Sequence, residues 1–241
     1  MRFFSEEVNK FFTSLVKTNI ESREKHGIVR PDMIHLLLEA RKNGLKHEES
    51  HSIQDTGFAT VEEHEFTKNA KKIERVMTDQ DIASQALIFF FAGFDTVSSL
   101  MSLMSYELAV NPYVQDKLVQ EVDDTLETCG GKISYEGLLG MKYMDMVVSE
   151  SLRKWPNTVT TDRISTKPYT IEPKYPDEKP LHLEKNSSIW IPIFAIHRDP
   201  KYYPEPERFD PERFNDENKV NIKPYTYLPF GIGPRNCIGS R

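Results

Sequence analysis

The stretch PFGIGPRNCIG, residues 229–239, surrounds one cysteine with glycine, proline and a basic side chain. Glycine adopts backbone conformations that are closed to other residues and lets a flat ligand approach the main chain closely, while proline stiffens a loop. A neighbouring arginine and free backbone N–H groups would tune a sulfur bound to a metal. The alternative, from the residues alone, is a buried and inert thiol in a glycine-rich turn.

The composition excludes several classes of protein. The chain of 241 residues has 31 Lys and Arg against 37 Asp and Glu, a formal net charge of −6, so it has no electrostatic reason to bind nucleic acid. Cys129 and Cys237 are far apart in the sequence, so we expect no disulfide framework and a reducing compartment or cytosolic face. The charged N-terminus predicts neither a signal peptide nor an anchor in this chain.

The first two thirds of the chain predict helices, because apolar residues recur at three- and four-residue steps. Asp32 and Thr78 are placed to cap two of these helices, and Trp155-Pro156 closes the last one. The apolar run Ile82–Phe94 is shorter than the roughly 20 residues that span a bilayer, so it predicts a buried core helix. The expected helices cover residues 4–16, 32–43, 78–110, 112–130 and 141–154.

After Pro156 the sequence favours short strands separated by proline-bearing turns. The expected strands cover residues 162–166, 169–172 and 188–193. Residues 200–234 are too rich in proline for much regular structure, and residues 44–76 predict a surface loop. We therefore expect a mainly α fold with a small β portion, in a single domain over residues 1–241.

The cysteine segment resembles the haem-binding loop of the cytochrome P-450 family, Phe-x-x-Gly-x-Arg-x-Cys-x-Gly. Phe230, Gly233, Arg235, Cys237 and Gly239 occupy its fixed positions. The resemblance implies that Cys237 ligates the iron of haem b, that Arg235 neutralises a haem propionate and that Phe230 packs near the ligand sulfur. In such haems the thiolate pushes electron density that favours O–O cleavage.

A second motif, AGFDT at residues 92–96, lies inside the apolar helix. From the residues alone, the glycine breaks the helix and Asp95 caps a new one, or the glycine opens a groove over a cofactor. The motif resembles the family's oxygen-activating helix, which implies that Asp95 and Thr96 manage protons during oxygen activation. It departs from the family at Val97, where a second hydroxyl is usual, with Ser98 one step on.

A third pattern joins Glu150 and Arg153 with a distant arginine, Arg213 in PERF at residues 211–214. Two opposite charges three residues apart on a helix are by default a solvated ion pair worth about 0.2–0.5 kcal/mol. The set resembles the family's Glu-x-x-Arg and Pro-Glu-Arg-Phe elements, which implies a structural lock of the core beneath the haem. Arg163 falls where many members place another propionate-binding arginine, and the alternative is a partner in a surface ion pair. His197 is expected to be structural.

The resemblance covers nearly the whole chain and is to microsomal animal enzymes, particularly insect ones that clear foreign compounds. It implies the C-terminal part of the cytochrome P-450 fold, with the N-terminal part and the end after the cysteine loop missing. The full-length parent would lie on the cytosolic face of the endoplasmic reticulum membrane. It would use dioxygen, a lipophilic small-molecule substrate and an NADPH-dependent reductase, and residues 89–96 and 157–161 would line its pocket.

Two alternative hypotheses remain open besides a haem-thiolate monooxygenase. The chain of 241 residues could be a truncated, non-catalytic fragment that binds haem weakly or not at all. A relative that isomerises peroxides is a third hypothesis, against which the presence of Asp95 and Thr96 argues.

Overall fold

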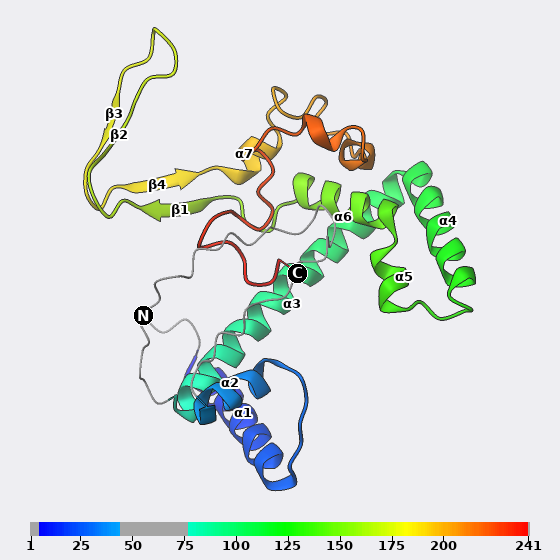
Figure 1. Cartoon of the computed structure of the whole chain (residues 1–241), viewed down its shortest axis with the longest axis vertical. Coiled ribbons are helices and arrows are strands. Elements are labelled where there is room, and N and C mark those ends of the chain that lie inside the picture. The colour runs from blue at the N-terminus through cyan, green and yellow to red at the C-terminus, as the bar shows by residue number, and fades with distance from the viewer. Residues whose placement is uncertain (1–4, 44–76, 241) are drawn as a thin grey trace. The chain divides into compact units, whose positions relative to one another are not determined.

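The computed structural model describes residues 5–43 and 77–240, so the surface loop expected over residues 44–76 lies outside the described residues. The described chain forms two compact units, one of residues 5–43 with 77–98 and one of residues 99–240 (Figure 1). One long helix contributes its first part to one unit and its second part to the other.

Helices form most of the regular structure of the described residues, which confirms the mainly α fold with a small β portion. The helices are α1 Glu6–His26, α2 Met33–Asn43, α3 Asp79–Val110, α4 Pro112–Thr128, α5 Tyr135–Leu139, α6 Lys142–Lys154 and α7 Ile193–His197. The strands are β1 Thr161–Ile164, β2 Tyr169–Ile171, β3 Leu181–Leu183 and β4 Ser188–Ile191, followed by the 3-10 turns η1 Pro211–Phe214 and η2 Lys219–Asn221. The strand β3 and the helix α7 were not predicted, and α5 replaces an expected turn.

In the first unit, local side-chain caps start the helices. The Asp32 carboxylate accepts the backbone N–H of His35 at 3.0 Å, as its position before α2 predicted. Thr78 and Asp81 form a reciprocal capping box at the start of α3, with N–H to oxygen distances of 2.9 and 3.2 Å. The core of this unit consists of Val16, Ile20, Leu38, Ile82 and Ala83.

The predicted burial of the apolar run in α3 is wrong beyond its first turn. Ile82 is fully buried, but Ile88 and Phe94 are 59% and 64% exposed. Periodicity identifies side chains that share a face, whereas burial depends on what covers that face. By length and composition alone α3 could cross a membrane, a criterion that core helices of soluble proteins also meet, so it has little weight.

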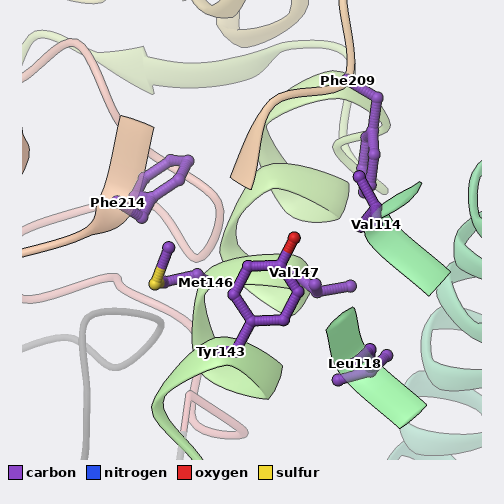
Figure 2. Packing of buried hydrophobic residues seen from close by; sticks show 7 residues of the cluster. All are labelled: Val114, Leu118, Tyr143, Met146, Val147, Phe209 and Phe214. Carbon is purple, nitrogen blue, oxygen red and sulfur yellow. The ribbon is translucent and has the colours of Figure 1, made fainter. Parts of the chain in front are cut away.

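In the second unit, α4 and α6 pack together around a core shown in Figure 2. Its buried members are Val114, Leu118, Tyr143, Met146, Val147, Phe209 and Phe214. Two of them, Phe209 and Phe214, come from the irregular segment that follows α7, so this segment is fixed against α6. The strands form an antiparallel β1–β4 pair from which the β2–β3 hairpin extends (Figure 1).

A carboxylate from α4 caps the start of α6. Glu121 accepts the backbone N–H groups of Tyr143 and Met144 at 2.7 and 2.8 Å. These are among the N–H groups that have no partner within the helix, and a negative charge there also complements the helix dipole. Glu121 therefore fixes the start of the helix that bears Glu150 and Arg153.

We expect Glu121→Ala to lower the free energy of unfolding by about 1–2 kcal/mol, because two charge-assisted hydrogen bonds to a helix terminus are lost. The control is Asp123→Ala, which removes an exposed carboxylate from the same helix. Urea unfolding measures both changes. Equal effects of the two substitutions would contradict this role of Glu121.

Candidate functional site

The cysteine segment is a compact series of turns held by its own backbone. Gly231 and Gly233 adopt left-handed backbone conformations with φ of 70° and 81°, which only glycine adopts without strain. The Cys237 N–H donates to the Phe230 carbonyl oxygen at 2.8 Å, so both ends of the loop are joined. The Gly239 N–H lies 3.3 Å from the Cys237 Sγ, toward which it donates.

The Cys237 side chain is exposed, so the alternative of a buried thiol is wrong. A cysteine exposed on a compact loop is accessible to a ligand. The Gly239 N–H is a donor of the kind that stabilises a thiolate and tunes a metal-bound sulfur. Arg235 is also exposed on this loop, and Phe230 is half-buried.

Glu150 and Arg153 on α6 form a fully buried ion pair rather than a solvated one. Both side chains are 0% exposed, and Arg153 donates to the two carboxylate oxygens at 2.7 and 2.8 Å. The Asp210 N–H adds a bond to Glu150 at 2.9 Å, and the Arg213 Nε lies 3.6 Å away, at ion-pair distance. Burial raises the pKa of Glu150, and the hydrogen bonds from Arg153 oppose that rise. The structure thus brings Glu150, Arg153 and Arg213 together.

The Arg153 guanidinium also fastens the irregular segment to α6. It donates to the carbonyl oxygens of His197 and Pro206, each at 2.8 Å. These bonds span 44 and 53 residues of sequence. One buried side chain therefore joins α6, the end of α7 and the approach to η1.

His197 is fully buried and both ring nitrogens have partners. Its Nε2 lies 2.8 Å from the backbone nitrogen of Leu228, and its Nδ1 lies 3.1 Å from the Arg153 carbonyl oxygen. Because a backbone N–H can only donate, Nε2 is the acceptor and the proton is on Nδ1, which donates to Arg153. A structural role was expected for His197, but its bond to Leu228 was not, because the residues next to His197 in the sequence contain no signal for it.

This geometry predicts a pH dependence of stability. Burial lowers the pKa of His197 from its ordinary value of 6.5 to about 4. Above that ordinary value the ring is neutral in both the folded and the unfolded chain, so its stabilising contacts are fully present. As the pH falls from about 6.5 to about 4, only the unfolded chain takes up the proton, and the free energy of unfolding falls by up to about 1.4 kcal/mol per pH unit.

We expect His197→Gln to remove this part of the pH dependence. Unfolding curves of the two proteins at several pH values measure it, since the other titrating groups are shared and cancel in the difference. Parallel stability profiles between about pH 6.5 and 4 would show that His197 is not neutral and buried.

Asp95 and Thr96 lie on an uninterrupted stretch of α3, so the alternative of a helix break at Gly93 is wrong. Both side chains are exposed, and the Thr96 hydroxyl donates to the Ala92 carbonyl oxygen at 2.6 Å. They belong to the unit of residues 5–43 and 77–98, whereas Cys237 belongs to the other unit.

Arg163 lies on β1, half-buried, and donates to the Thr161 hydroxyl at 3.1 Å and to the Asp162 carbonyl oxygen at 2.8 Å.

Within residues 5–43 and 77–240, no three His, Cys, Asp or Glu side chains gather as a metal site. A haem iron needs only an axial side chain from the protein, such as a cysteine thiolate. The exposed Cys237, the Gly239 N–H directed at its sulfur and the presence of Arg235 on the same loop fit that group.

Comparison with known proteins identifies the family. The sequence model described as Cytochrome P450 matches residues 2–241. The chain therefore belongs to the cytochrome P450 family, as its motifs indicated.

Its relatives include insect members of two groups. The chain is 50% identical over 241 residues to Cytochrome P450 9e2 of Blattella germanica, covering 100% of this chain and 42% of that protein. It is 42% identical over 244 residues to Probable cytochrome P450 9f2 of Drosophila melanogaster, with 100% and 42% covered. Cytochrome P450 6k1 of Blattella germanica is 39% identical, with 99% and 43% covered. The chain thus spans less than half the length of these relatives.

Proposed function

We propose that the protein containing this chain is a haem-thiolate monooxygenase that inserts one oxygen atom of dioxygen into a lipophilic small molecule. The observation that supports it most is the exposed Cys237 on a compact loop, with the Gly239 N–H directed at its sulfur. Membership of the cytochrome P450 family supports the same chemistry. An NADPH-dependent reductase supplies the electrons, and the enzyme acts on foreign compounds at the cytosolic face of the endoplasmic reticulum membrane.

The loop residues would hold haem b in distinct ways. Cys237 would ligate the iron, and Arg235 and Arg163 would pair with the propionates. Phe230 would pack near the sulfur, while Gly233 and Gly239 would leave space for the flat macrocycle; a Cβ at Gly233 would meet no atom within 4 Å. When bound, the haem supplies oxygen activation, assisted by electron density from the thiolate.

Glu150, Arg153 and Arg213 do not touch the reacting atoms in this proposal. Their network fixes the irregular segment of residues 198–214 to α6. Residues 215–228 lie between this segment and the cysteine loop, so the network would fix the start of the chain that leads to the loop. Their role is structural.

Asp95 and Thr96 are the proposed catalytic residues. A carboxylate and a hydroxyl beside each other on an apolar helix can accept and release protons in a controlled order. They would deliver protons where oxygen is activated.

We expect Thr96→Ala and Asp95→Asn to uncouple NADPH oxidation from product formation, with peroxide or water released and haem content unchanged. The product formed per NADPH should fall by about tenfold or more, because a positioned proton donor contributes about 10²–10⁴-fold. The measurement compares NADPH consumption, peroxide and product in the full-length enzyme.

The matched control is Ser105→Ala, which removes a similar hydroxyl from α3, one that donates to the Met101 carbonyl oxygen at 2.8 Å. This variant should remain coupled. Fully coupled turnover in both the Asp95 and the Thr96 variants would mean that the motif at residues 92–96 is only a feature of the helix.

A further inference from the structure

The main chain that enters the cysteine loop is fastened at one point by a side chain from α7. The Leu228 N–H donates to the His197 Nε2 at 2.8 Å in a fully buried environment. Leu228 precedes the loop, and its carbonyl oxygen accepts the Gly231 N–H at 3.2 Å. The Phe230 carbonyl oxygen in turn accepts the Cys237 N–H at 2.8 Å. A short series of bonds thus joins the imidazole to the backbone of Cys237.

The other side of the imidazole is anchored on α6. Its Nδ1–H donates to the Arg153 carbonyl oxygen, and the Arg153 guanidinium donates back to the His197 carbonyl oxygen. The ring also stacks on Tyr227 with centroids 5.6 Å apart, and the Tyr227 hydroxyl donates to the Ser149 carbonyl oxygen at 3.1 Å. The histidine therefore joins the helix with the buried ion pair to the chain entering the cysteine loop.

We propose that His197 is a positioning residue for the haem ligand: it sets the main chain at Leu228 and thereby holds Cys237 in place to ligate iron. The proposal rests on the proposed function, since it assumes that Cys237 binds the haem. A buried N–H without an acceptor is costly, so losing the imidazole would favour movement of Leu228 toward other partners or water. That movement would be transmitted to Cys237 through the Phe230 carbonyl.

Only the acceptor at the ε position is needed to hold Leu228. Substitutions that keep one polar group and remove the other can therefore distinguish the contributions of the two ring nitrogens. Glutamine places an amide oxygen near the position of Nε2 and keeps the acceptor. Asparagine places its amide near Nδ1, so it keeps the donor to Arg153 but loses the acceptor for Leu228. Phenylalanine keeps the ring volume and loses both.

The experiment uses the full-length, haem-loaded enzyme and its His197→Gln, His197→Asn and His197→Phe variants. Carbon monoxide is added to the reduced proteins. The thiolate-type Soret band is then followed over time, well below the unfolding temperature, as the thiolate-ligated form converts to a form without thiolate ligation. We expect the Phe and Asn variants to lose the thiolate form about five- to tenfold faster than the wild type, and the Gln variant to remain within about twofold. Amide exchange at Leu228 should rise in parallel, while exchange at Met144 stays constant.

The proposal would be overturned if the thiolate form of the Phe and Asn variants decayed with the same half-life as that of the wild type. A Gln variant that decays as fast as the Phe variant would also overturn it, because the histidine would then be a general core residue. Absence of a thiolate-type band in the wild-type enzyme is a different result: it would overturn the proposed function itself.

Discussion

Arg153→Met is expected to lower the free energy of unfolding by about 3–5 kcal/mol, because it leaves a buried charge without its partner. The Glu150 carboxylate would retain the Asp210 N–H and the Arg213 guanidinium, whose Nε lies at 3.6 Å. The carbonyl oxygens of His197 and Pro206 would also lose their donor. Methionine retains the apolar stem, so the change reports the guanidinium and not a large cavity.

A matched control lies in the same unit. Glu205 and Arg208 have the same three-residue spacing, but their side chains are 74% and 64% exposed and 3.5 Å apart. Arg208→Met should change the free energy of unfolding by less than about 0.5 kcal/mol, as expected for an exposed pair. Urea unfolding of both variants gives the comparison. Similarly small changes in the free energy of unfolding of the two variants would mean that the Glu150–Arg153 pair does not stabilise the fold as a buried ion pair.

The second large effect is expected at Cys237. Cys237→Ser should reduce NADPH-dependent product formation by the full-length enzyme to background, because a serine hydroxyl is not ionised near neutral pH and supplies no thiolate. Cys129→Ser is the control, since Cys129 is half-buried at the end of α4. That variant should keep wild-type turnover. Turnover by Cys237→Ser at the wild-type rate would contradict the assignment.

Much of the fold could be predicted because its signals are local. Asp32 and Thr78 cap helices at the predicted places, and α4 begins at Pro112 after Asn111. Each of these features depends on residues within a few positions along the chain. Trp155 ends α6 for the same kind of reason, since proline follows it.

The features that were not predicted correctly depend on residues far away in the sequence. The strand β3 is only three residues long and is defined by pairing with β2, where Thr170 lies opposite His182. The burial of Ile88 and Phe94 was overestimated, because the apolar pattern of a helix does not specify which surface it meets.

In the candidate site too, features with local sequence signals could be predicted, whereas features that depend on distant residues could not. The cysteine loop was recognised because its glycines, arginine and cysteine occupy contiguous sequence, and the positive φ of Gly231 and Gly233 agrees with that interpretation. The buried character of Glu150 and Arg153 could not be predicted from spacing, since Glu205 and Arg208 share that spacing at the surface. Likewise, the bond from Leu228 to His197 joins residues 31 positions apart.

The ferrous–carbonyl spectrum of the full-length enzyme tests the central claim, ligation of iron by the Cys237 thiolate, most directly. The account predicts the strongly red-shifted Soret band of thiolate ligation in the wild type and in Cys129→Ser, and its loss in Cys237→Ser. An unchanged red-shifted band in Cys237→Ser would contradict the account, because another group would then be the ligand.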